Sequence, residues 1–357
     1  MYLYEPKISM KNQFIPLVLL LILFIQQGNG QTPNDKNMAE VRLSAANTIT
    51  AEDLSELLYT FAADSMQGRM TATKGQKMAA NYLKSYYQKN GISGAQADDE
   101  YFQNIPMDYF NRKFIKQDSE NVVAVIEGAQ WPDEYIVLSA HYDHVGARGD
   151  TIYNGADVDG SGTVALLEIA QAFKTAKDKV YGPKRSLVFL HVTGEEIGLY
   201  GSRYYTENPL FPLTQTVCNL NTDMIGRIDP NKAGNDNYIY LIGSDKLSQE
   251  LHDVSEQVND RFVDLELDYT FNDENDPNRF YYRSDHYNFA QKNIPIIFYF
   301  NGVHEDYHQP TDTPDKIHYP LMAKRTQLIF HTAWEVANRE NRIRADKLTQ
   351  DTDNQKQ

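Results

Sequence analysis

The feature that most constrains the fold is a series of short apolar runs that alternate with helical patterns. The runs are NVVAVIEG (121–128), YIVLSA (135–140), SLVFLHVT (186–193), TVCNLNTD (216–223), YIYLIG (238–243) and IPIIFYF (294–300). Several are apolar throughout, as expected for strands that are covered on both faces. Apolar residues at helical spacing occur at 51–65, 73–90, 161–177, 197–207, 245–258 and 320–340. We therefore predict a three-layer α/β/α sandwich around a mixed, mostly parallel central sheet.

The first thirty residues are expected to lie outside this fold. Lys11 precedes a run of twelve residues, FIPLVLLLILFI (14–25), and small and polar residues follow it. A charged start, a short apolar core and a small-residue exit are typical of a secretory signal. A membrane anchor is the alternative, but the run is shorter than the roughly 20 residues that span a bilayer. We expect a secreted or periplasmic protein with a signal peptide at 1–30.

The rest of the chain is expected to form one unit. We predict a polar linker at 31–50, a single catalytic domain at 51–345 and a polar tail at 346–357, with no independent second domain. Cys218 is the only cysteine, which excludes an intrachain disulfide. The chain has 49 acidic and 34 basic residues and a formal net charge of -15. Nucleic acid is therefore not an expected partner, because phosphate contacts need lysine and arginine.

Histidine, aspartate or glutamate follows nearly every predicted strand. In sheets of this type, ligands bind beyond the carboxyl ends of the strands. The residues at these positions are His141, Asp143, His144, Asp157, Asp159, Glu195, Glu196, Asp223, His304, Glu305, Asp306 and His308. Imidazole and carboxylate without a nearby thiolate suit zinc, with cobalt or manganese as substitutes. A cluster this large exceeds the three protein ligands of one catalytic zinc, and it suits two ions that share a carboxylate.

The adjacent carboxylates Glu195 and Glu196 fit such a centre. Neighbouring like charges repel, but a bound cation removes the repulsion. Glu196 would then bind metal, and Glu195 would remain free as a general base for a water molecule. The alternative is a solvated helix start, where acidic residues are favoured by the helix dipole.

The motifs H-x-D, G-A-D-x-D-G-S-G, T-G-E-E-x-G-L-x-G-S, N-x-D-M-I-G-R and Y-H-x-P-x-D-T occur in this order. Together they resemble the secreted zinc-dependent aminopeptidases of peptidase family M28, which are related to bacterial leucyl aminopeptidases. The resemblance runs from about Leu54 to Ala337 and implies a zinc-exopeptidase fold. It implies two zinc ions held by His141, Asp157, Glu196, Asp223 and His308, with Asp157 shared between them. It also implies that Glu195 is the catalytic base.

The resemblance assigns further roles around this centre. Asp143 would accept a hydrogen bond from His141, and Asp285 and His286 in RSDHYNF (283–289) would bind substrate. Relatives often carry Asp or Asn directly after the shared aspartate, whereas this chain has Val158. The peptide bond between these two residues can be cis in relatives. The remaining histidines near the motifs match no ligand position, and we interpret them as packing residues or as partners of ligands; they are His144, His191 and His304.

The expected activity is hydrolysis of N-terminal peptide bonds in peptides with a free N-terminus. Three alternatives stay open at this point. One is a metal-dependent carboxypeptidase or deacylase, although the sixty or so residues between Asp223 and Ser284 are short for the lid domain of such enzymes. The second is a glutaminyl cyclase with a single zinc. The third is a binding module without enzymatic activity, which would be expected to have lost the general base Glu195.

Overall fold

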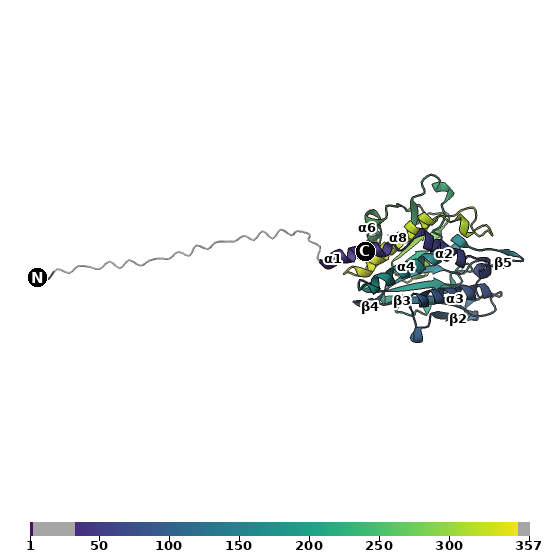
Figure 1. Ribbon diagram of the computed structural model, residues 1–357, viewed down its shortest axis with the longest axis horizontal. Coiled ribbons are helices and arrows are strands. Elements are labelled where there is room, and N and C mark those ends of the chain that lie inside the picture. Colours follow the sequence, from purple (N-terminus) through teal and green to yellow (C-terminus); the bar gives the residue numbers. More distant parts are fainter. Residues whose placement is uncertain (3–32, 349–357) are drawn as a thin grey trace, which may run out of the picture.

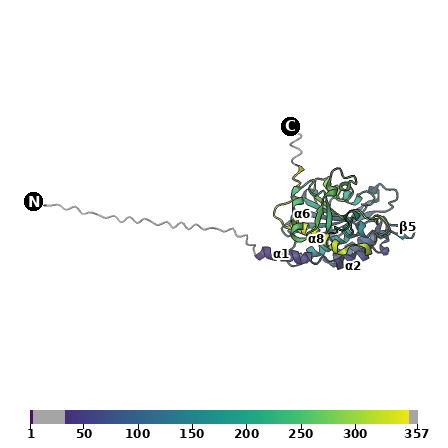
Figure 2. The same ribbon diagram turned by 90° about the horizontal axis from the view of Figure 1, so that it is seen from above.

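The computed structural model describes residues 1–2 and 33–348 (Figures 1 and 2). Most of the predicted signal at 1–30 and residues 349–357 of the predicted tail lie outside the described residues. None of the helices in the described ranges combines the length and apolar character that crossing a bilayer requires.

A mixed sheet of nine strands forms the centre of the molecule, as predicted. The order across the sheet is β1-β3-β7-β4-β8-β11-β9-β10, and β2 also pairs with β3. The strands are β1 (Ser93–Gly94), β2 (Phe102–Ile105), β3 (Ser119–Ile126), β4 (Trp131–His141), β7 (Arg185–Val192), β8 (Thr216–Thr222), β9 (Tyr238–Ile242), β10 (Glu266–Asp268) and β11 (Ile296–Phe300). The four central strands, β7, β4, β8 and β11, run parallel, and β3 and β9 flank them antiparallel. A separate hairpin joins β5 (Ala147–Arg148) to β6 (Thr151–Ile152).

Helices cover both faces of the sheet. They are α1 (Pro33–Ala46), α2 (Ala51–Phe61), α3 (Lys74–Lys89), α4 (Gly162–Asp178), α5 (Tyr200–Glu207), α6 (Gln249–Phe262), α7 (His286–Ala290) and α8 (Tyr319–Asn338). Alternate residues of β4 point to opposite layers: Leu138 packs with the layer of α2, α3, α4, α6 and α8, and Val137 packs with Tyr205 of α5 and Phe289 of α7. This double covering explains why the central strands read as continuous apolar runs.

The prediction of a linker at 31–50 is wrong, because α1 occupies most of it. Arg42 of α1 is buried and donates from Nε to His331 Nδ1 at 3.0 Å and from Nη2 to the His331 carbonyl at 2.9 Å. Ala45 and Ile49 are buried in the main core beside α4 and α8. The segment reads as polar because its apolar contacts are few and one of its buried contacts is made by an arginine.

Buried Arg69 fixes the loop that follows β4. Its guanidinium donates to the carbonyls of Tyr142 at 2.9 Å, Asn154 at 2.6 Å, Gly155 at 2.9 Å and Phe61 at 3.3 Å. Burial lowers the pKa of Arg69 to about 10, which leaves the side chain charged at neutral pH. One side chain therefore holds both ends of the segment between β4 and α4.

Arg325 of α8 holds the loop that follows β8 in the same way. It is buried and donates to the carbonyls of Tyr238 at 2.9 Å, Ile225 at 2.9 Å and Arg227 at 2.7 Å. The loop after β8 is thereby fixed to the helical layer. The two arginines thus hold the loop after β4, which carries His144, and the loop after β8, which carries Asp223.

Candidate metal centre

The residues of the sequence motifs meet at the carboxyl end of the four parallel strands. This edge is where ligands bind in open α/β sheets, because loops from neighbouring strands converge there. The side chains that the structure brings together are His141 and His144 after β4, Glu195 and Glu196 after β7, Asp223 after β8 and His308 after β11.

One group of possible ligands consists of His141, Asp159 and Asp223, and we call it the His141 group. Its ligand atoms lie within 4.8 Å of one another. His141 Nε2 is 3.5 Å from Asp223 Oδ1. Burial and the nearby charge of Asp223 raise the pKa of Asp159 well above its usual range. A bound cation would relieve this crowding of negative charge.

The second group consists of His144, Glu196 and His308, and we call it the Glu196 group. Glu196 Oε1 is 2.9 Å from His144 Nδ1, and Glu196 Oε2 is 3.0 Å from His308 Nε2. Burial acts to raise the pKa of Glu196, but the hydrogen bonds from both histidines outweigh it and hold that pKa well below its usual range. Burial lowers the pKa of His144 to about 4, so its imidazole is neutral and able to bind a metal.

Glu195 lies beside both groups and belongs to neither. Its Oε2 is 3.8 Å from His141 Nε2, and its main-chain N–H donates to Asp143 Oδ1 at 3.2 Å. Burial raises the pKa of Glu195 well above its usual range; the charge of His141 opposes this effect, and Glu196 adds to it. The side chain of Glu195 therefore lines the cavity beside the two groups.

Asp157 does not lie where it was expected, and the prediction that it is a shared ligand is wrong. Its Oδ2 is 3.0 Å from His304 Nε2, and its Oδ1 accepts the N–H of Gly226 at 2.7 Å. Both oxygens are thus engaged away from the two groups. The next residue, Val158, lines the cavity instead, and the cis peptide bond is Val158–Asp159 rather than Asp157–Val158.

The expected contact between His141 and Asp143 forms through a different atom. His141 Nδ1 is 3.0 Å from the main-chain oxygen of Asp143, whereas the Asp143 carboxylate is 3.8 Å away. That carboxylate accepts the Thr71 hydroxyl at 2.7 Å and the N–H of Glu195. A proton on Nδ1 leaves Nε2 of His141 free to face Asp223, which is the tautomer a metal ligand needs.

Asp285 and His286, expected to bind substrate, do not line the cavity. Asp285 is buried and accepts the Ser202 hydroxyl at 2.5 Å, and burial raises its pKa to about 7. His286 Nε2 is 2.8 Å from the Tyr281 carbonyl, and its ring stacks on Phe298 with centroids 4.7 Å apart. His286 therefore supports the cavity wall from behind, whereas Asp285 binds α5.

The cavity wall contains several aromatic side chains. The lining residues beyond the two groups are Val158, Glu195, Met224, Phe280, Arg283, Phe298, Phe300, Val303 and Tyr307. Phe298 and Phe300 are two residues apart on β11, so they face the same side. That spacing was one available signal for this wall, and Phe280 in an aromatic segment of the sequence was another.

The other histidines near the motifs have different surroundings. His191 Nε2 is 2.7 Å from the Tyr87 hydroxyl in the core, as expected of a packing residue. His304 is the buried partner of Asp157. His144, which we also expected to pack or to support a ligand, contributes its own ring to the Glu196 group.

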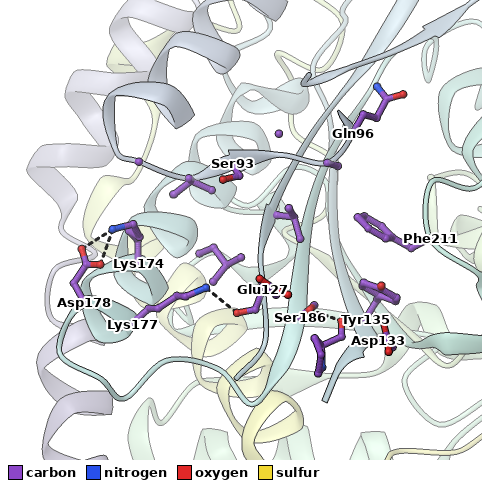
Figure 3. Close-up of a pocket in the computed structure, with 17 residues that line it drawn as sticks. Ser93, Gln96, Glu127, Asp133, Tyr135, Lys174, Lys177, Asp178, Ser186 and Phe211 are labelled. Atoms are coloured by element: carbon purple, nitrogen blue, oxygen red, sulfur yellow. Dashed lines mark hydrogen bonds and ion pairs between the residues drawn. The ribbon is translucent and has the colours of Figure 1, made fainter. Parts of the chain in front are cut away.

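A second hollow, with a volume of about 510 Å³, lies at the opposite end of the parallel strands, where β4 and β7 begin (Figure 3). Two of its lysines are already paired. Lys174 Nζ is 2.6 Å from both carboxylate oxygens of Asp178, and Lys177 Nζ is 2.9 Å from the Glu127 main-chain oxygen. No histidine or cysteine is among the residues that line it. The candidate chemistry therefore lies at the other edge of the sheet.

Comparisons with known proteins point to the same kind of centre. The family model described as Peptidase family M28 matches residues 121–333. The fold is similar to that of the LapA aminopeptidase of Legionella pneumophila, with a TM-score of 0.66 and 21% identity over 85% of this chain and 76% of that one. It is also similar to BSAP, a zinc aminopeptidase from Bacillus subtilis, with a TM-score of 0.62 and 16% identity over 82% and 97% of the two chains.

Relatives found by sequence carry more than one activity name. Aminopeptidase NAALADL1 of Rattus norvegicus is 34% identical over 34% of this chain, and a probable glutamate carboxypeptidase, LAMP1, of Arabidopsis thaliana is 35% identical over 29%. A probable zinc metalloprotease of Pyricularia oryzae is 36% identical over 30%. These matches span 15%, 14% and 21% of the relatives' own lengths.

Proposed function

Because the chain belongs to peptidase family M28, we propose that it is a zinc-dependent aminopeptidase that removes N-terminal residues from peptides. One observation carries the proposal: Glu195 lies beside two groups of histidine and carboxylate side chains, at the mouth of a cavity with an aromatic wall. The solved aminopeptidases support the fold, and the chemistry rests on the residues of this chain.

The donor atoms of the two groups suit zinc. Each group combines imidazole with carboxylate, and its ligand atoms are close enough to surround one ion. We propose two Zn²⁺ ions, with Co²⁺ or Mn²⁺ as substitutes. When bound, such ions polarise a carbonyl oxygen and make water a better nucleophile at neutral pH.

Glu195 is proposed to move the proton in this reaction. Its carboxylate accepts a proton from the attacking water and passes it to the amine that leaves. The hydrogen bond from the main-chain N–H of Glu195 to the Asp143 carboxylate fixes the main chain. The side chain of Glu195 therefore keeps its place beside His141. The side chain of Glu195 is only 12% exposed, which limits the number of competing water molecules.

The cavity suggests which end of a peptide is bound. The carboxylates of Glu195 and Asp223 attract a free α-ammonium group, and the aromatic wall formed by Phe280, Phe298 and Phe300 accommodates an apolar side chain. We therefore propose apolar N-terminal residues as substrates.

We also propose that the protein is exported. The support is the pattern of Lys11 and the apolar run 14–25, which is typical of a secretory signal. Its peptide substrates would then lie outside the cytoplasm.

A panel of substrates tests the proposed reaction. Leucyl- and phenylalanyl-nitroanilide should be hydrolysed, and a metal chelator should abolish the reaction. Acetylated versions should not be cleaved, because they lack the α-ammonium group. A blocked peptide that loses its C-terminal residue would instead indicate a carboxypeptidase. Cyclisation of N-terminal glutamine without hydrolysis would indicate a cyclase.

A further inference from the structure

The two groups have no ligand in common in the part of the chain that the structure describes. The cavity between them is lined by His141 and Asp223 of one group, by His308 of the other, and by the side chain of Val158. A valine offers no donor atom to a cation. Val158 thus adds an isopropyl group to this lining and no carboxylate that the two groups could share.

Asp157 cannot take this place without giving up contacts it already has. It is fully buried, and its two oxygens face His304 and the N–H of Gly226. Its main-chain N–H donates to the Asp312 carboxylate at 3.0 Å, which fixes the backbone as well. His304 does not serve as a ligand in either group, because its ring is buried and paired with Asp157.

His144 completes the Glu196 group from the other side. Its ring centroid is 5.6 Å from that of His308, and its Nδ1 faces Glu196. Gly155 makes room for this ring, since a Cβ at that position would lie 2.5 Å from two of its atoms. The main-chain N–H of His144 donates to the Arg69 carbonyl at 3.3 Å, so both the ring and the backbone are held.

We propose that this chain binds its two ions with two separate ligand sets. His141 and Asp223 hold one ion, the Glu196 group holds the other with His144 as a ligand, and Val158 separates them. Binding of one ion then positions no ligand for the other ion. Loss of a ligand from one group lowers the affinity for one ion only. The inference rests on the metal dependence proposed above, but it does not need the peptidase activity.

Zinc titration against a chromophoric chelator, with atomic absorption for stoichiometry, tests this without any substrate. The protein should bind about two ions. His144→Ala should weaken one of them by more than the roughly 10–100-fold that loss of a hydrogen-bonded partner of a ligand costs, and leave the other within twofold. Asp223→Asn should weaken the other ion alone. If both ions keep their affinity in His144→Ala, or if each substitution weakens both ions equally, the separate sets do not exist.

Val158 provides a gain-of-binding test with a matched control. Val158→Asp places a carboxylate between the groups and should tighten both ions, whereas Val158→Ala should change neither. Circular dichroism and thermal melting confirm that each variant is folded. A folded Val158→Asp protein with no tighter ion would overturn the assignment of this position. Two bound ions without hydrolysis would overturn the proposed function and leave this inference intact.

Discussion

Replacing Arg69 with lysine should destabilise the protein strongly even though the charge is kept. The guanidinium satisfies four carbonyl oxygens from three separate segments. A lysine ammonium has three N–H donors at a single point, so at least one of the four carbonyl oxygens loses its partner. Each buried acceptor without a partner costs about 1–3 kcal/mol, so the expected loss is about 1–3 kcal/mol or more.

Urea unfolding followed by circular dichroism measures this loss at pH 7. Arg148→Lys is a matched control, because Arg148 is exposed on β5, and its substitution should change the free energy of unfolding by no more than about 0.5 kcal/mol. Zinc affinity should fall as well in Arg69→Lys, since the loop that Arg69 holds carries His144. A loss below about 1 kcal/mol would refute the view that these four contacts position the loop.

Three further outcomes are expected. Glu195→Gln should keep its zinc, as measured by atomic absorption, and lose about 10²–10⁴-fold in rate, the usual size of a general-base contribution; an unchanged rate would remove Glu195 from its proposed role. Burial, with a smaller effect from the charge of Asp53, raises the pKa of Glu168 to about 7 from an ordinary 4.5. The folded state therefore holds this proton more tightly, so stability is fully present below pH 4.5 and falls as the pH rises to 7. Glu168→Gln should flatten this dependence and stabilise the protein at pH 8 by up to roughly 3 kcal/mol in urea titrations, and an unaltered pH profile would contradict it. A chelator should lower the melting temperature, and added zinc should restore it, because the ions bind only the folded chain; equal melting with and without zinc would count against a bound metal.

The central sheet was predictable because burial on both faces leaves a strong mark on the sequence. All six apolar runs became strands at nearly the predicted positions. The edge strands β1, β2 and β10 were missed, since strands of two to four residues carry too few side chains to show a pattern. The linker prediction failed at α1 for a related reason: a helix held by Arg42 is polar where a packed helix is usually apolar.

The candidate site was predictable in its residue types and less so in its geometry. Glu195, Glu196, Asp223 and His308 follow strands whose ends are close by topology alone, and the structure brings them together. The sequence D-V-D does not tell which side chain faces the cavity, because this depends on how the backbone turns before α4.

His144 was underrated for a similar reason. Its neighbours in sequence say nothing about the space that Gly155 leaves for its ring. Contacts of this kind join segments that are distant in the chain, so only the folded structure reveals them.

Helix α1 has a practical consequence for work with this protein. A shortened version that begins at residue 51 would look sensible from hydropathy, yet it would strip the cover from His331 and from the ring of Phe262, over which the Arg42 guanidinium lies at 4.1 Å. Such a fragment would expose an apolar face of its largest helix layer and would tend to aggregate. Recombinant versions should therefore begin before Pro33, so that α1 continues to cover this layer.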